Sequence, residues 1–241
     1  MNIDKNKVLF KDKKIRPEFL IHTCKKRSWY AYNFLVPELK RQGVCDERIK
    51  IYNDDNMEGN LKAYIKSIDL INKYNDVLVV NLQDDVWISE DFVKFVESLS
   101  SDYSKIYNLF CCCYDGNNKH QVGFVDGNKS WFSFSCIIIH NSVMLKFLDW
   151  FKSTKVQNKY KNLIASNKND DLIFKNFLID NNIKSFNIGR SLVENIDNLI
   201  GGSSINKRDI MIHNYYWTNK KALEQLAKRI DKYSTIHNIY H

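Results

Sequence analysis

The chain has 241 residues, of which 44% are hydrophobic, and its 36 Lys and Arg residues outnumber its 28 Asp and Glu residues, giving a formal net charge of +8. This length and apolar content suffice for a sizeable core and argue against a disordered or fibrous chain. The sequence has no apolar run of about 20 residues, as a membrane span needs, and residues 1–16 are charged, unlike a secretory signal. We therefore expect a cytoplasmic protein with one domain over residues 1–241.

The positive charge is concentrated in three segments. Residues 1–16, 24–50 and 205–241 each carry a net charge of +4, so the rest of the chain sums to −4. We expect the first segment to be a basic N-terminal extension and the last to contain a basic helix over residues 219–233. A basic periphery around an acidic middle predicts an anionic partner, and general solubility is the alternative explanation.

Strand and helix patterns alternate along the chain. Strands are predicted over residues 18–23, 48–52, 76–82, 106–114, 131–140 and 184–188. Helices are predicted over residues 29–39, 60–74, 89–99, 142–151, 170–179 and 219–233. Pro37 should kink the first helix, and Ser89 should cap the third. This order is typical of an α/β protein with a mainly parallel sheet flanked by helices.

A pair of acidic residues, Asp84 and Asp85, follows the most strand-like segment, residues 76–82. A continuous apolar strand is usually covered on both faces in a parallel sheet, and ligands bind beyond the carboxyl ends of such strands. Carboxylates at that position need a cation, and Mg²⁺ or Mn²⁺ prefers carboxylate and phosphate oxygens. The pair predicts a divalent ion that bridges to a diphosphate, with a solvated turn before the next helix as the alternative.

Two segments resemble GT-A glycosyltransferases, which hold a metal and a nucleotide-sugar through a D-x-D or E-D-D motif. Residues 77–86, Val-Leu-Val-Val-Asn-Leu-Gln-Asp-Asp-Val, resemble the strand and acidic motif of that family. Residues 191–196, Ser-Leu-Val-Glu-Asn-Ile, with Ser-Ser-Ile at 203–205, resemble the S-L-V-x-H-I-G … S-S-I segment of small members, many of them bacterial or phage-encoded. The resemblance covers residues 18 to about 215 and implies a GT-A-like (Rossmann-like) mixed, mainly parallel sheet. The chain departs from the family pattern at three positions: Gln83, Asn195 and Asp197.

The resemblance implies roles for individual side chains around a metal and a donor. Asp85 would be the principal ligand of Mn²⁺ or Mg²⁺, and Asp84 would face the ribose or the outer sphere of the ion. Arg27 would contact the nucleotide, because a guanidinium suits phosphate and base edges; one more charge in a Lys-Lys-Arg run is the alternative. A late His often completes the metal site in this family, which implies His213, and a packed His at a strand end is the alternative. The donor is expected to contact four residues: Thr23, Arg27, Asn60 and Asp84.

Catalysis requires a base for the acceptor hydroxyl. Asp170 or Asp171 is the candidate, because the pair opens a helix at the position where the family places its base. Two Asp residues at a helix start are also typical of helix capping, which is the alternative. Trp131 could form a stacking wall for the acceptor, although an aromatic strand residue is more often part of a core.

The function that these patterns predict is transfer of a sugar from a nucleotide-sugar, a UDP-sugar first among the donors, to an acceptor hydroxyl. The basic margin suits double-stranded DNA with a hydroxymethylated base as the acceptor, and a cell-surface glycan or wall polymer is the alternative. A non-enzymatic nucleic-acid-binding module, with residues 5–16 and 220–232 gripping phosphates, explains the charge but not the acidic strand end. A nucleotidyltransferase ranks lower, because the chain lacks a glycine-rich phosphate loop.

Overall fold

The computed structural model describes residues 16–71, 73, 76–99, 105–110, 124–126, 134–167, 169–188, 192–200, 220–237 and 239. The strands are β1 (Glu18–Cys24), β2 (Ile49–Asp54), β3 (Leu78–Gln83), β4 (Val86–Ile88), β5 (Ile106–Asn108), β6 (Phe124–Asp126), β7 (Cys136–His140), β8 (Ser185–Ile188) and β9 (Val193–Asn195).

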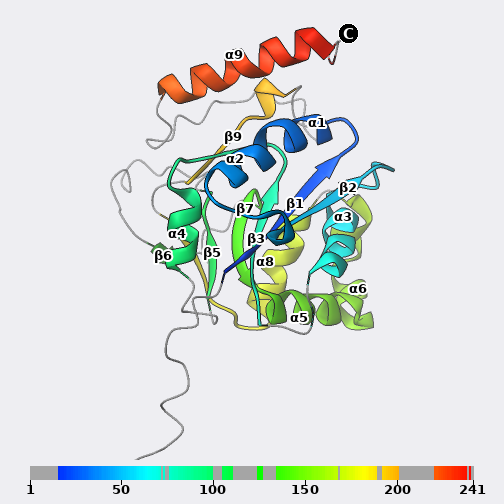
Figure 1. The fold of residues 1–241 in the computed structure, drawn as a ribbon. Coiled ribbons are helices and arrows are strands. Elements are labelled where there is room, and N and C mark those ends of the chain that lie inside the picture. Colours follow the sequence, from blue (N-terminus) through cyan, green and yellow to red (C-terminus); the bar gives the residue numbers. More distant parts are fainter. Residues whose placement is uncertain are drawn as a thin grey trace, which may run out of the picture.

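The described strands form a seven-stranded mixed sheet in the order β2-β1-β3-β7-β5-β8-β6, and β4 pairs with β9 in a separate ribbon (Figure 1). Five strands of the large sheet run in one direction, while β6 and β7 run in the other. The prediction of an α/β protein with a mixed, mainly parallel sheet is confirmed at this level.

Helices cover both faces of the sheet (Figure 1). They are α1 (Ser28–Tyr30), the π-helical η2 (Ala31–Leu35), α2 (Val36–Arg41), the 3-10 turns η3 (Asp46–Arg48), η4 (Ile68–Leu70) and η5 (Asp197–Leu199), α3 (Asn60–Ser67), α4 (Phe92–Ser98), α5 (Asn141–Lys152), α6 (Thr154–Lys159), α7 (Lys161–Ser166), α8 (Asp170–Asp180) and α9 (Lys220–His237). None of the described helices has the length and apolarity needed to cross a membrane.

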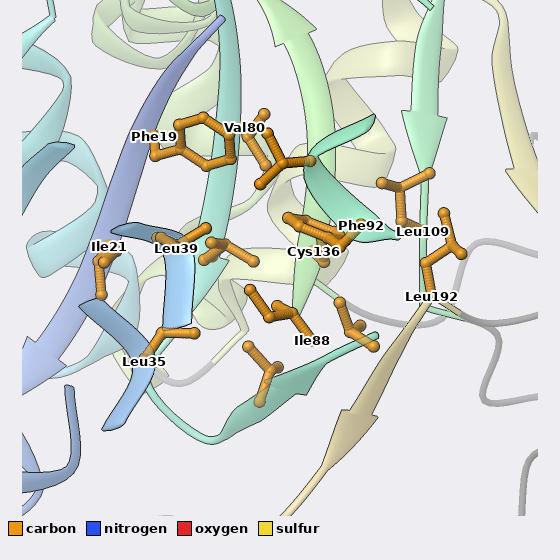
Figure 2. Packing of buried hydrophobic residues seen from close by; sticks show 14 of the residues in the cluster. Phe19, Ile21, Leu35, Leu39, Val80, Ile88, Phe92, Leu109, Cys136 and Leu192 are labelled. Atoms are coloured by element: carbon orange, nitrogen blue, oxygen red, sulfur yellow. The ribbon is translucent and has the colours of Figure 1, made fainter. Parts of the chain in front are cut away.

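Residues alternate between two cores because successive strand side chains point to opposite faces of the sheet. Phe19 and Ile21 pack against α1, α2 and α4, together with Val80 and Cys136 (Figure 2). Leu20 faces the other way, into the core beneath α3, α5 and α8. Both faces of β1, β3 and β7 are therefore buried, as the continuous apolar run of residues 76–82 predicts for β3.

Several helix boundaries in the structure differ from the predicted ones. Helix α4 begins at Phe92, and the prediction of Ser89 as its N-cap is wrong: Asp91 occupies that position without a side-chain bond. The reason is that Ser89 continues the β4–β9 pairing, because its backbone N–H donates to Leu192 O at 3.0 Å. The π-helical η2 ends just before α2, where Pro37 lies in the first turn. Proline clashes with the carbonyl four residues back in a regular helix, so the predicted irregularity takes the form of a widened turn.

Other differences lie in short elements. The helix predicted over residues 60–74 is shorter in the structure, where α3 is followed by the 3-10 turn η4 and ends there. Helices α6 and α7 occupy a polar stretch where no helix was predicted. Strand β5 stops at Asn108, and β7 starts at Cys136. The basic helix expected at residues 219–233 is present as α9 and continues to His237. It lies beside α1 (Figure 1). The rings of Tyr233 and Trp29 stack there, with their centroids 5.6 Å apart.

The topology gathers strand ends at one edge. Because β1 lies between β2 and β3 and is parallel to both, Cys24, Asp54 and Gln83 end side by side. Antiparallel β7 begins at the same edge, where the backbone N–H of Gln83 donates to Ser135 O at 3.0 Å. This carboxyl edge is where an α/β sheet binds its ligands.

Candidate active site

A cavity of about 400 Å³ opens at the carboxyl edge of β1, β2 and β3. Its walls come from these strand ends, from the first residues of α3 and α8, and from the segment that joins β9 to η5. The structure brings six of the sequence-predicted site residues together in its lining: Thr23, Arg27, Asn60, Asp84, Asp85 and Asp170.

Three carboxylates surround the Arg27 guanidinium at one end of the cavity. Arg27 lies 2.7 Å from Asp84 Oδ1, 2.7 Å from Asp197 Oδ1 and 3.5 Å from Asp85 Oδ2. The Arg27 side chain is only 13% exposed, so this cluster is largely withdrawn from water. Arg27 thus serves as an internal counter-ion, in addition to any contact that it makes with a nucleotide.

The two adjacent aspartates are held differently. Asp84 is 1% exposed, and its Oδ2 accepts hydrogen bonds from Thr23 Oγ1 at 2.7 Å and from the backbone N–H of Cys24 at 3.3 Å. Asp85 Oδ1 is buried and accepts no hydrogen bond from the described residues. Asp84 Oδ1 likewise accepts no hydrogen bond, but it lies 2.7 Å from the Arg27 guanidinium, whereas Arg27 approaches the other oxygen of Asp85, Oδ2. Buried carboxylate oxygens are rarely left without a partner, so Asp85 is the residue with an oxygen to offer to a cation.

Contacts from distant elements fix the acidic turn. The backbone N–H of Ile196 donates to Asp85 O at 2.8 Å, and the Tyr30 hydroxyl donates to Val86 O at 3.0 Å. The same pairing of β4 with β9 carries Asp197 to Arg27. Asp197 is therefore part of the site because of tertiary pairing, not because of a local motif.

The carboxylates outnumber the cation at this end. Burial raises the pKa of Asp84, and burial together with the neighbouring Asp85 carboxylate raises the pKa of Asp197. Burial alone would lower the pKa of Arg27, but the three carboxylates outweigh it, and the pKa of the guanidinium rises further above its ordinary value. The cluster therefore holds excess negative charge that a divalent cation would neutralise.

Asp170 and Asp171 occupy different environments at the start of α8. Asp170 is buried in the cavity wall, 3.5 Å from Gln83 Nε2, and burial raises its pKa to about 7, with a smaller contribution from Asp171. Asp171 does not line the cavity, and its Oδ1 accepts the backbone N–H of Leu172 at 2.7 Å. The geometry places Asp170, rather than Asp171, where it can contact a ligand.

On the α3 side of the cavity, the described lining residues include two carboxylates, Asp54 and Asp170, and no Lys or Arg. His22 bonds to Asn81, and burial lowers the pKa of His22 to about 4, which keeps its ring neutral. Tyr64 is 1% exposed and lines the same wall. The sequence pattern did not single out Tyr64 because it occupies an apolar position on the helix.

The rim on this side is built around Asn167. Its Oδ1 accepts the backbone N–H of Lys62 at 3.1 Å, and its Nδ2 donates to Glu58 O. Asp54 Oδ1 and Oδ2 accept the backbone N–H groups of Glu58 and Gly59 at 3.0 and 3.1 Å. These contacts hold the loop that leads to Asn60, the first residue of α3.

Two predicted site residues, His213 and Trp131, lie outside the described residues. Several lining residues were not predicted, namely His22, Asp54, Tyr64, Gln83, Asn195 and Asp197. Of these, Gln83, Asn195 and Asp197 stand at the positions where the chain departs from the GT-A pattern, and that departure was the available signal.

A divalent ion such as Mn²⁺ or Mg²⁺ would need oxygen ligands at this edge of the sheet. Within the part of the chain that the structure describes, no three His, Cys, Asp or Glu side chains are arranged to hold a metal ion by themselves. Mg²⁺ usually binds through one or two carboxylates plus substrate phosphates and water, rather than in an all-protein cage. The unpartnered oxygen of Asp85 fits that mode, in which a diphosphate supplies further ligands.

No protein-family model matches this chain, and no curated protein sequence matches it. The resemblance to GT-A enzymes therefore rests on the sequence motifs.

Proposed function

We propose that this chain is a metal-dependent glycosyltransferase with a GT-A-like fold, which transfers a sugar from a nucleotide-sugar, a UDP-sugar first, to an acceptor hydroxyl. One observation carries the proposal. Asp84 and Asp85 from the end of β3 and Asp170 from the start of α8 line a single cavity at the carboxyl edge of parallel strands. That edge suits a nucleotide, and the two groups of carboxylates suit two tasks, cation binding and proton transfer.

The proposed reaction joins the acceptor oxygen to the anomeric carbon and breaks the bond between that carbon and the diphosphate. Asp170 takes the proton of the acceptor hydroxyl, and its pKa of about 7 is matched to a base that works near neutral pH. A divalent ion bound at Asp85 would supply positive charge for the departing diphosphate. Arg27 lies next to Asp85 and can donate to diphosphate oxygens.

The proposed acceptor is a polyanion, with a hydroxymethylated base in double-stranded DNA placed first and a cell-surface glycan or wall polymer second. Lys25 and Lys26 are exposed and immediately precede Arg27 at the cavity. Basic groups next to a catalytic centre bring phosphates close to it. With an acceptor in DNA, the proposed location of the protein is the cytoplasm.

A donor screen by thermal unfolding tests the proposal. UDP-sugars and GDP-sugars are added with and without Mn²⁺, and a true donor raises the unfolding midpoint by mass action. Asp85→Asn should abolish the Mn²⁺-dependent part of the shift, while Asp76→Asn, whose side chain is 91% exposed, should keep it. A wild-type protein that no donor stabilises, but that binds DNA equally well after Asp85→Ala, would instead support the non-enzymatic nucleic-acid-binding module.

A further inference from the structure

The Tyr64 hydroxyl is a buried polar group in the wall of the cavity. Its oxygen has no hydrogen-bond partner within the part of the chain that the structure describes. The ring is fixed by aromatic neighbours, with centroids 4.5 Å away at Phe134, 5.6 Å at Phe147 and 6.2 Å at Phe174. A buried hydroxyl is costly unless it is hydrogen-bonded, so its place in the wall of a cavity points to a ligand.

The surroundings of Tyr64 select the chemistry of that ligand. Gln83 and the buried Asp170 offer hydrogen-bonding groups, and Asp170 is close enough to act electrostatically on the Tyr64 hydroxyl. The centroid of the His22 ring lies 5.5 Å from that of the Tyr64 ring. Arg27 is the only Lys or Arg among the described residues that line the cavity, and its carboxylate partners hold it at the other end. A phosphate would find no cation beside Tyr64, whereas a ring that carries hydroxyl groups would find several hydrogen-bonding partners.

We infer that the Tyr64 end of the cavity binds the donor sugar, and that the Tyr64 hydroxyl hydrogen-bonds a hydroxyl group of that sugar. The inference rests on the proposed function, in which the diphosphate lies at Asp85 and Arg27. Residues 83–85 are consecutive and connect the two ends, since Gln83 faces Asp170 while Asp85 faces Arg27. A sugar attached directly to the diphosphate therefore lies within reach of Tyr64.

The test compares the ligand affinities of Tyr64→Phe and the wild-type protein by isothermal titration calorimetry. UDP is compared with UDP-glucose, and GDP with GDP-mannose, all in the presence of Mn²⁺. Tyr64→Phe should bind the nucleoside diphosphate as the wild type does, but should bind its sugar conjugate about three- to tenfold more weakly, the loss of one hydrogen bond. The unfolding midpoint of Tyr64→Phe should stay the same or rise, because the described part of the protein gives that hydroxyl no partner.

Tyr30→Phe is the matched control. The Tyr30 hydroxyl is also buried but bonds to Val86 O at 3.0 Å, so its removal should lower the unfolding midpoint and leave the ratio of the two affinities unchanged. An unchanged ratio in Tyr64→Phe, or equal weakening of UDP and UDP-glucose, overturns the sugar site but leaves the proposed function standing. If the wild type binds neither the diphosphates nor their sugar conjugates, the proposed function fails and the sugar site fails with it.

Discussion

Single side chains at this site have properties that elementary electrostatics explains. The pKa of Asp170 rises because its carboxylate is withdrawn from water at the cavity wall. Arg27 stays charged because three carboxylates hold it, even though burial opposes the charge. Burial of these two ionisable groups lowers the stability of the fold, and groups with such perturbed pKa values are often found at functional sites.

The first prediction concerns Asp170 and pH. With a folded pKa of about 7 against an ordinary value of 3.8, the native protein keeps a proton that the unfolded chain releases between these values. Stability therefore falls as pH rises through that window, and the whole penalty is present above pH 7. Asp170→Asn, which cannot ionise, should lose less free energy of unfolding than the wild type between about pH 5 and about pH 8 in urea titrations. Asp149→Asn, at an exposed position of α5, should follow the wild type. If the Asp170 carboxyl of the wild type were ionised throughout this range, Asp170→Asn would follow the wild type as well.

The second prediction concerns Arg27. Arg27→Gln leaves three carboxylates without their cation and should lower the free energy of unfolding by about 3–5 kcal/mol. Mn²⁺ should restore part of that stability by binding the folded state. Lys40→Gln is the control, because the side chains of Lys40 and Asp46 are 45% and 73% exposed and their pairing is an ordinary surface contact worth about 0–1 kcal/mol. Equal, small decreases for both variants in urea unfolding would show that the carboxylate cluster does not depend on Arg27.

Among the elements, the loop between β2 and α3 depends on one glycine. Gly59 adopts a φ of +100°, and a Cβ there would lie 2.6 Å from Asn167 Nδ2 and 2.9 Å from Asn167 O. Asn167 in turn bonds to the backbone on both sides of Gly59, at Glu58 and Lys62. The close approach of two backbones at the cavity rim therefore requires a residue without a side chain.

Gly59→Ala is predicted to cost more than Gly43→Ala. Gly43 also has a positive φ of +95°, but nothing lies within 4 Å of its added Cβ, so only the backbone penalty of about 1–2 kcal/mol applies. Urea unfolding measures the decrease in stability of each variant, and nucleotide titration shows whether Gly59→Ala also weakens binding at the rim. Equal decreases for the two variants would mean that the contact with Asn167 does not shape the loop.

The elements that could be predicted from the sequence are those with long, regular patterns. The apolar run of β3 and the acidic pair after it placed Asp84 and Asp85 at a strand end, and the structure agrees. The pairing of β4 with β9 was not predictable, because each has three residues and too little periodicity to reveal a partner far along the chain. Asp197 was missed for that reason, since only this pairing brings it to Arg27.

At the scale of the whole molecule, the cavity is acidic, whereas the chain as a whole is basic. The described part of α9 exposes three basic residues, Lys228, Arg229 and Lys232, and two acidic ones, Glu224 and Asp231, and the chain carries a net charge of +8. Such a surface attracts polyanions from a distance and orients them.

A salt series on duplex DNA tests whether the acceptor is nucleic acid. The logarithm of the affinity should fall linearly with the logarithm of salt, and Lys228→Gln with Lys232→Gln should reduce the slope by about 0.9 for each phosphate that the variant no longer neutralises. Lys159→Gln is the control, because Lys159 on α6 pairs with Asp180, at the end of the molecule away from α9 (Figure 1). An affinity for duplex DNA that does not change with salt concentration would remove DNA from the candidate acceptors.

The central claim is that the buried oxygen of Asp85 and a nucleotide diphosphate bind one divalent cation together. Electron paramagnetic resonance of free Mn²⁺ measures this directly, with and without UDP or GDP, in the wild type, Asp85→Asn and Asp76→Asn. We predict weak Mn²⁺ binding alone, at least about tenfold tighter binding with the matching diphosphate, a difference of about 1.4 kcal/mol, and disappearance of that gain in Asp85→Asn only. Mn²⁺ binding that neither the diphosphates nor Asp85→Asn changes would contradict the account.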